Sequence, residues 1–405
     1  MTARAPLRRR LPSSRQVVAF GAAITVLGLH ATVAAPLTVI AAVVLAPGLV
    51  LLFQRSGRTM RTLLAGATGL ATTFVGVAVH IGRVATGTAD GADYTGVVAA
   101  AAGVALIGLA FTVALHRRRM RAKLLAIPAG LVLLQWFAAP LMGAALITNA
   151  ARPWVPAAWT LQIDGARDVT FPTTDGVRLA GWYVPGQTGA TVILMHGSHG
   201  TRADTLLHLR TLTAAGYGVL AFDARGHGES AGRTNALGWR GTDDVAGAVA
   251  FLRQQGADPR RIAALGLSMG GEEALRAAAA GVPLAAVVAD GAGSSTAADK
   301  RLVETGITAP IAHSVTWLTM RATELLTGDA EPPPLNEVAR DVPVPVLLIA
   351  SRAPGELALD RLYRDRVGAG AALWHVDDVD HTEALARHPR AYSRRLDTWL
   401  AAALD

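Results

Sequence analysis

The first residue whose surroundings predict chemistry is Ser268. It stands in the segment Arg261-Ile-Ala-Ala-Leu-Gly-Leu-Ser-Met-Gly-Gly271, where an apolar run leads through Gly-x-Ser-x-Gly into residues typical of a helix. A sharp strand-to-helix turn of this kind exposes the serine hydroxyl, and side chains at the flanking glycines would collide with neighbouring backbone. Because the chain holds 42 glycines, the motif alone can arise by chance, so the prediction of a nucleophile depends on its neighbours.

A second segment is suited to hold the negative charge that develops when a serine attacks a carbonyl group. Thr191-Val-Ile-Leu-Met-His-Gly-Ser-His-Gly200 is an apolar run that ends in His-Gly. The backbone N–H groups of such a loop, together with the one after the nucleophile, form an oxyanion hole. We predict Ser198 and Met269 as the two donors, with His199 as the alternate to Ser198. His196 is expected to brace the loop, and no metal site is predicted.

Together with Asp223-Ala-Arg-Gly-His-Gly-Glu-Ser230, these segments resemble the α/β-hydrolase superfamily, in particular its monoacylglycerol-lipase, serine-aminopeptidase-like and dienelactone-hydrolase-like branches. The resemblance covers about residues 165–402. It implies a mostly parallel eight-stranded sheet with helices on both faces, and a covalent acyl-enzyme formed without metal or cofactor. It also implies that Asp223, Arg225 and His227 shape a structural turn near the pocket.

In this superfamily the catalytic histidine follows the acid in the chain and lies in a loop after the last strand. Ala372-Leu-Trp-His-Val-Asp-Asp-Val-Asp-His-Thr-Glu383 provides that loop, so we predict His381 as the general base. An imidazole suits this role because its pKa near neutrality lets it take the serine proton and return it to the leaving group. His375, within the predicted strand, and His388, on the following helix, are expected to be structural.

The acid that would orient His381 is less clearly marked. The superfamily places an Asp or Glu shortly after the strand that we predict at 344–350, where this chain has Glu356. We therefore predict Glu356 as the acid, with Asp360, one helical turn further on, and Asp290, at the end of the preceding strand, as alternates. A competing interpretation is that Glu356 is only a first-turn carboxylate favoured by the helix dipole.

The elements that must position these residues alternate between short apolar runs and longer helical stretches, which indicates a largely parallel sheet covered on both faces. The first two runs, joined by Thr-Thr-Asp-Gly, are predicted to form a hairpin. Predicted strands are 168–172, 177–184, 190–195, 217–222, 262–266, 284–289, 344–350 and 371–376, and predicted helices are 202–215, 241–255, 270–280, 356–368 and 383–402.

Residues 294–341 form an insertion before the seventh predicted strand. It contains a helical stretch, Ile311–Leu326, and the run Glu331-Pro-Pro-Pro334. In the superfamily an insertion at this place commonly forms a lid over the pocket. Trp317, Leu318 and Met320 are suited either to contact an acyl chain or to pack in the core.

The N-terminal part of the chain has a different composition from the rest. Of all 405 residues 17% are charged, against about 25% in a soluble globular protein. Val17–Phe53 contains 37 residues without Asp, Glu, Lys or Arg, too many for one membrane-spanning helix of about 20 residues. We predict an all-α transmembrane domain, 17–150, with helices at 17–35, 36–53, 62–82, 95–115 and 124–148, followed by an interfacial linker, 151–164, and a hydrolase domain, 165–405.

The basic residues fix the predicted orientation. Residues 1–123 carry 14 Arg and Lys against two Asp, whereas the remainder carries 24 against 28 acids. With five spans every basic cluster lies on one side, which the positive-inside rule makes cytoplasmic. The segment 1–16 is then cytoplasmic and the hydrolase domain extracytoplasmic, in a multi-pass protein of the cell membrane. We expect anchoring charge here and no nucleic-acid partner. The absence of cysteine excludes a thiol nucleophile and disulfides.

These patterns predict a membrane-anchored serine hydrolase that cleaves an ester, thioester or amide bond. An acyltransferase on the same scaffold is an alternative, because exclusion of water turns hydrolysis of an acyl-enzyme into transfer. A catalytically weak membrane sensor or interaction protein is another. The expected substrate is a small molecule, a lipid-like molecule or a peptide, and no cofactor is expected.

Overall fold

The computed structural model describes most of the C-terminal part of the chain, residues 152–232 and 235–404. The chain divides into two compact units, one formed by 1–81 with 91–142 and the other by 82–90 with 143–405. Before residue 152 the structure describes residues 57, 60, 62–70, 72–73, 76, 101–108, 110, 136 and 139–148.

Among these described residues no helix is both long enough and apolar enough to cross a membrane. The predicted cytoplasmic segment 1–16 and the predicted spans 17–35 and 36–53 lie outside the described residues. The predicted spans 62–82, 95–115 and 124–148 are described only in part, and α7 (Ala139–Thr148) is the last part of the third of these.

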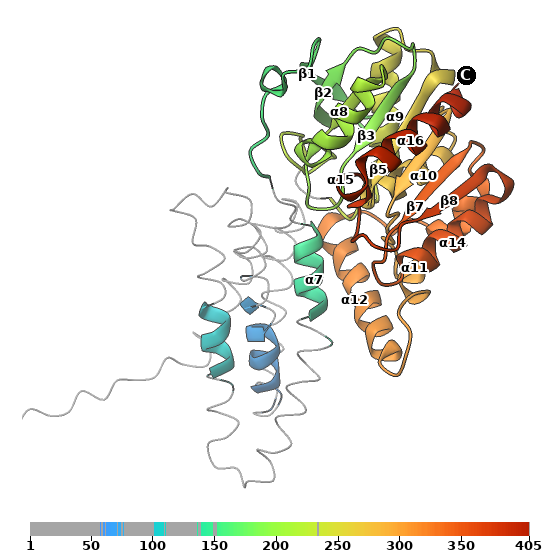
Figure 1. The fold of residues 1–405 in the computed structure, drawn as a ribbon. Coiled ribbons are helices and arrows are strands. Elements are labelled where there is room, and N and C mark those ends of the chain that lie inside the picture. Colours follow the sequence, from blue (N-terminus) through green and yellow to red (C-terminus); the bar gives the residue numbers. More distant parts are fainter. Residues whose placement is uncertain are drawn as a thin grey trace, which may run out of the picture. The chain divides into compact units, whose positions relative to one another are not determined.

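One eight-stranded sheet forms the centre of the second unit (Figure 1), in the order β1-β2-β4-β3-β5-β6-β7-β8. Strand β2 runs antiparallel to β1 and β4, and all other neighbours are parallel. The prediction of a mostly parallel eight-stranded sheet is confirmed. The strands are β1 Arg167–Pro172, β2 Arg178–Val184, β3 Thr191–Met195, β4 Gly218–Phe222, β5 Ile262–Leu267, β6 Ala286–Asp290, β7 Val346–Ala350 and β8 Ala371–His375.

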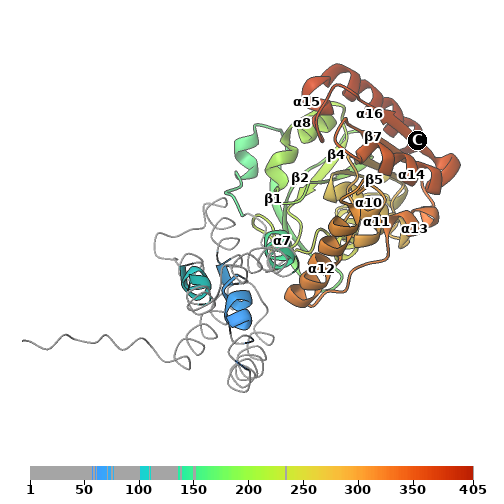
Figure 2. The same ribbon diagram turned by 90° about the horizontal axis from the view of Figure 1, so that it is seen from below.

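Helices cover both faces of this sheet, as Figure 2 shows with α15 and α16 on one side and α10 on the other. Strands β3 to β7 are buried along their whole length, because side chains on both faces meet a helical layer. One buried cluster joins the sheet to α8 and α16, and a second joins it to α9, α10 and α14. The helices of these layers are α8 Leu206–Ala214, α9 Gly241–Gln254, α10 Met269–Ala279, α14 Glu356–Val367, α15 Ala384–Arg387 and α16 Pro389–Leu404.

Two predicted helices begin or continue differently from the prediction. The stretch 202–215 starts as a 3-10 turn, η4 (Arg202–Thr205), capped by reciprocal hydrogen bonds between Thr201 and Asp204. The stretch 383–402 is interrupted between α15 and α16. Pro389 cannot continue the helix that precedes it, and His388 before it leaves the helical conformation at φ −124°, ψ 57°.

The insertion 294–341 is helical, and the predicted helix 311–326 is confirmed as α12, which is slightly longer. Two hydrogen bonds tie the insertion to α10. The hydroxyl of Ser295 donates to Glu272 (2.5 Å), and Arg276, which pairs with Glu272 within the helix (2.7 Å), donates to the carbonyl of Pro333 (2.5 Å). The insertion contains α11 Ala297–Arg301, α12 Ala309–Thr327, α13 Leu335–Val338 and the 3-10 turn η6 Ala339–Asp341.

The predicted interfacial linker lies against the sheet. Arg152 donates a hydrogen bond to the carbonyl of Ser230 (2.9 Å), and the indole of Trp182 donates one to the carbonyl of Pro156 (3.1 Å). Ala158 and Leu161, in the 3-10 turn η3 (Ala158–Leu161), belong to the buried cluster on that face. The hydrolase domain therefore has its first packed contacts before β1 begins.

Candidate active site

Ser268 lies at the junction of β5 and α10 in a backbone conformation that side chains rarely adopt, φ 53° and ψ −113°. Its N–H group donates a hydrogen bond to the carbonyl of Asp290 at the end of β6 (2.8 Å). Such a conformation costs about 1–3 kcal/mol and persists only where the surrounding structure enforces it. The strand-to-helix turn predicted from Gly-x-Ser-x-Gly is therefore present.

The flanking glycines have no room for side chains. A Cβ atom at Gly266 would lie 2.1 Å from the backbone of Gly270, and one at Gly270 would lie 2.7 Å from the Cβ of Met195. The two glycines thus let the first turn of α10 approach both β5 and the end of β3. This approach brings Ser268 to the loop that follows β3.

That loop is held by His196 in one tautomer. The N–H of Ala224 donates to Nε2 of His196 (3.0 Å), so the ring proton is on Nδ1, which donates to the carbonyl of Gly197 (2.7 Å). Burial also lowers the pKa of His196, which favours the neutral ring. The predicted bracing role of His196 agrees with this geometry.

The same carbonyl orients the predicted oxyanion donor. The Gly197 carbonyl also accepts from the N–H of Gly200 (3.2 Å), and in a trans peptide the N–H of Ser198 must point the opposite way. A Cβ atom at Gly197 would lie 3.3 Å from the Cβ of Ser268, so this peptide borders the serine. The N–H of Met269, the first residue of α10, has no acceptor within its helix. His199 is exposed and adopts a positive φ of 61°.

His381 and Glu356 form a hydrogen-bonded pair. Nδ1 of His381 donates to Oε2 of Glu356 (2.5 Å), and the other carboxylate oxygen accepts from the N–H of Ser351 (2.5 Å). The ring of His381 lies against Gly291, where a Cβ atom would come within 2.8 Å of Cε1. Gly291 follows Asp290, whose carbonyl binds the N–H of Ser268, so the end of β6 joins the pair to the serine.

The pair shifts the pKa values of both members. Burial raises the pKa of Glu356, but the hydrogen bonds from His381 and Ser351 outweigh it and the pKa is lowered. The hydrogen bond to Glu356 raises the pKa of His381. Glu356 is therefore ionised at neutral pH and holds the proton of His381 on Nδ1, which leaves Nε2 as the basic nitrogen.

The two alternate acids make other contacts. The carboxylate of Asp290 accepts a hydrogen bond from the hydroxyl of Tyr392 (2.9 Å), and burial raises its pKa to about 7. Asp360 is fully buried, and neither of its carboxyl oxygens has a partner among residues 152–232 and 235–404. Burial and the neighbouring Glu356 raise its pKa well above the usual range. Of the three carboxylates only Glu356 contacts His381 through a hydrogen bond.

Buried ionic groups support the loops around the site, and sequence reasoning identified only some of them. Asp223 accepts hydrogen bonds from the N–H (2.7 Å) and the guanidinium of Arg202, and Arg225 pairs with Asp244 (2.6 Å) and Asp175 (2.8 Å). Asp223 and Arg225 were expected to be structural, but their partners lie 19 or more positions away in the chain and carry no local signal. No group of three or more metal-ligating side chains is found in the described part of the chain.

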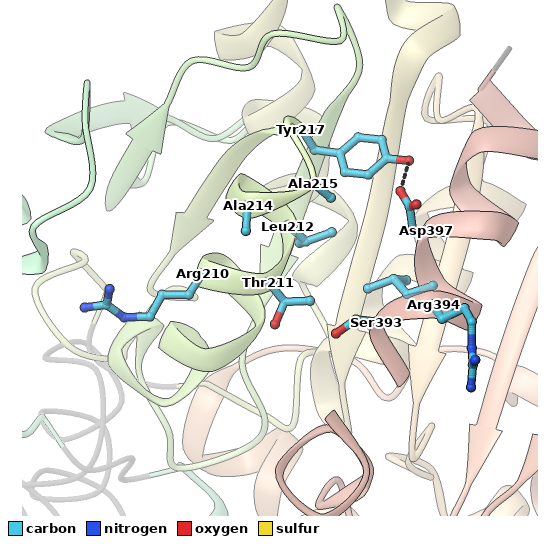
Figure 3. Close-up of a pocket in the computed structure, with 10 residues that line it drawn as sticks. Arg210, Thr211, Leu212, Ala214, Ala215, Tyr217, Ser393, Arg394 and Asp397 are labelled. Carbon is cyan, nitrogen blue, oxygen red and sulfur yellow. Dashed lines mark hydrogen bonds between the residues drawn. The ribbon is translucent and has the colours of Figure 1, made fainter. Parts of the chain in front are cut away.

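A separate groove lies between α8 and α16, with a volume of about 530 Å³ (Figure 3). The hydroxyl of Tyr217 donates a hydrogen bond to Asp397 across it (3.2 Å). Tyr217 immediately precedes β4, whereas Ser268 follows the end of β5, and these two strands run in the same direction. The groove is therefore at the opposite end of the sheet from the candidate active site.

Comparison with known proteins agrees with this geometry. Residues 175–392, more than half of the chain, match the model of the X-Pro dipeptidyl-peptidases (S15 family). The chain belongs to the S15 family. With its α/β-hydrolase fold, this membership makes the protein a hydrolase of the serine type.

Solved structures and curated proteins give further relatives. The Pyrococcus furiosus esterase Pf2001 is 25% identical with a TM-score of 0.52, and the match covers 63% of this chain and 98% of that one. Uncharacterized protein Rv2307c of Mycobacterium tuberculosis is 38% identical over 87 residues, and uncharacterized protein YfhR of Escherichia coli is 34% identical over 90. These two matches cover 21% of this chain and 31% of each relative, so the chain matches about a third of their length.

Replacement of Glu356 and of Asp290 should show which of these two carboxylates acts as the acid. In Glu356→Gln, kcat should fall by roughly 10³-fold or more, because the ring loses the acceptor that fixes its tautomer. Since Glu356 raises the pKa of His381, the acidic limb of the pH–rate profile should move to lower pH. Asp290→Asn should change kcat by less than about tenfold. The reverse ranking of these two variants would make Asp290 the acid.

Asp360 should make stability depend on pH. The folded protein keeps this carboxyl protonated at pH values where the unfolded chain has released the proton, so folding takes up a proton and the free energy of unfolding falls as pH rises. Asp360→Asn should match the wild type in acid and exceed its melting temperature increasingly towards pH 8. Asp365→Asn, at an exposed site on the same helix, is the control, and equal behaviour of the two variants would contradict the assignment.

Proposed function

We propose that this protein is a membrane-anchored serine hydrolase that cleaves a carboxylic ester through a covalent acyl-enzyme. In this proposal Ser268 is the nucleophile, His381 is the base and Glu356 is the acid. The hydrogen-bonded pair of Glu356 and His381, placed against the segment of β6 that also binds Ser268, is the observation that supports it most strongly.

The reaction follows from the proton positions. Oγ of Ser268 attacks the carbonyl carbon while its proton passes to Nε2 of His381, and Glu356 stabilises the imidazolium that forms. The N–H groups of Ser198 and Met269 bind the oxyanion of the tetrahedral intermediate. His381 then gives its proton to the leaving alkoxide. Water, deprotonated by His381, releases the acid and restores Ser268.

An ester is the preferred substrate class because the esterase from Pyrococcus furiosus is similar over nearly its whole length. The S15 match supports a second candidate, a peptide amide that follows proline. Both use the same acyl-enzyme, and they differ in the leaving group. Turnover of p-nitrophenyl butyrate, compared with that of alanyl-prolyl-p-nitroanilide, distinguishes the two.

The nucleophile is tested by covalent labelling. A fluorophosphonate probe should label the wild-type protein, and Ser268→Ala should abolish labelling and lower turnover by about 10⁴-fold or more. Ser393→Ala, a serine of the α8–α16 groove, should label like the wild type. An unlabelled wild-type protein, or a labelled Ser268→Ala variant, would contradict the proposed function.

Membrane anchoring is proposed from the composition and charge of residues 1–150. Packing within the first unit supports it: a Cβ atom at Gly103 would lie 2.5 Å from the carbonyl oxygen of Gly69, so two helical segments approach closely at glycines. Small residues at such crossings are common in membrane bundles.

The hydrolase domain is proposed to be extracytoplasmic, so protease added to spheroplasts should remove it. A domain protected until lysis would reverse the orientation.

A further inference from the structure

The insertion contains a stretch that combines exposure with absence of charge. Residues 305–320 include no Asp, Glu, Lys or Arg, and they form the turn before α12 and its first three turns. In Figure 1, α12 projects from the body of the domain, away from the sheet. Ile307, in the turn, is 98% exposed.

This turn is held by hydrogen bonds. Nε2 of His313 donates to the carbonyl of Glu304 (2.9 Å), and the hydroxyl of Thr316 donates to the Glu304 carboxylate (2.8 Å). The bonds join the chain before the turn to the second and third turns of α12. One carboxylate oxygen of Glu304, the acid nearest to the uncharged stretch, is thereby hydrogen-bonded within the insertion, whereas the other is buried without a hydrogen-bond partner in the described part of the chain.

The helix α12 carries apolar side chains on two sides. The apolar Met320 and Leu326 are buried against the domain, together with Thr319. Ile311, Trp317 and Leu325, on the other side, are 45%, 46% and 66% exposed. A helix that is apolar on its outward face as well needs a second apolar environment.

The contacts of the buried side of α12 indicate that this second apolar environment is the lipid bilayer. A Cβ atom at Gly143 would lie 3.1 Å from the Cγ2 of Thr319, and Ile147 packs against the cluster that contains Met320. Both residues belong to α7, the last part of the predicted span 124–148. The third turn of α12 thus packs beside α7, the segment proposed to leave the bilayer. The first charged residue of α12 is Arg321.

The dimensions fit one leaflet. From Ala309 to Met320 the helix is about 18 Å long at 1.5 Å per residue, whereas one leaflet contributes about 15 Å of hydrocarbon. The segment is long enough to enter the outer leaflet and too short to span the membrane. Lys300 and Arg301 end α11 just before the stretch, where they can meet anionic headgroups.

We propose that residues 305–320 form a finger that inserts into the outer leaflet and directs the active site towards acyl esters dissolved in the bilayer. The inference rests on the membrane anchoring in the proposed function. Val303, at the base of the finger, would be 2.9 Å from a Cβ atom at Gly355, the residue before Glu356. The finger therefore starts beside the acid of the proposed triad.

Insertion can be measured directly because the chain has no native cysteine. Full-length Ile307→Cys, labelled with the fluorophore NBD, is placed in nanodiscs of phosphatidylcholine and phosphatidylglycerol. Its emission should be quenched by lipids with a nitroxide on the acyl chain and protected from aqueous iodide. Leu207→Cys, at a leucine on α8 that is 46% exposed, should show the opposite pattern. Iodide quenching of the 307 label, or protection from both quenchers as in a protein contact, overturns the proposal.

A second measurement follows the consequence for substrate. Ile307→Asp should lower turnover of an acyl ester embedded in the nanodisc by about tenfold or more, because a charged side chain is strongly disfavoured in hydrocarbon. Turnover of soluble p-nitrophenyl acetate and fluorophosphonate labelling should stay unchanged. An equal loss on both esters, or no loss on the embedded one, contradicts the finger. If fluorophosphonate does not label the wild type, the proposed hydrolase activity is contradicted. The quenching of the 307 label tests insertion independently of that activity.

Discussion

The close approach of α10 to the strands beside it is the constraint on which the candidate site depends. Backbone atoms of Gly266 and Gly270 occupy space that any side chain would need, and Gly270 also touches the end of β3 through Met195. This approach places Ser268 in its rare conformation and aligns the start of α10 with the loop after β3. A looser junction would separate the N–H groups of Ser198 and Met269, the two donors proposed for the oxyanion.

The glycine motif predicted the strand-to-helix turn at Ser268, and the alternation of apolar runs predicted the strands. The strand boundaries differ from the prediction by at most two residues, because each strand is a short apolar run between polar turns. The break in the last helix was missed although Pro389 is a local signal for it. Ser268 and His381 follow from residue type and from their places after strands.

The sequence favoured Glu356 as the acid by its place after β7, but it left Asp290 and Asp360 as alternates. Asp290 ends β6 and Asp360 lies one helical turn beyond Glu356 on α14, so each is close to a place where the superfamily puts an acid. Their partners in the structure differ: the backbone N–H of Ser351 and the ring of His381 bind Glu356, whereas Tyr392, 102 positions from Asp290, binds that acid, and this difference supports the proposal of Glu356. Burial raises the pKa of Asp360, so this carboxyl keeps its proton. Contacts across such distances depend on the completed sheet, which no local pattern encodes.

The insertion contacts two parts of the proposed site, the start of α10 and the residue before Glu356. Through Ser295 it bonds to Glu272, on the first turn of the helix that begins with Met269, and through Val303 it touches the residue before Glu356. A shift of the insertion would therefore act on the oxyanion side and on the acid side together. If its finger lies in the leaflet, the bilayer helps to fix the geometry of both sides. An apolar ester taken directly from the lipid would avoid much of the cost of about 0.8 kcal/mol for each methylene exposed to water.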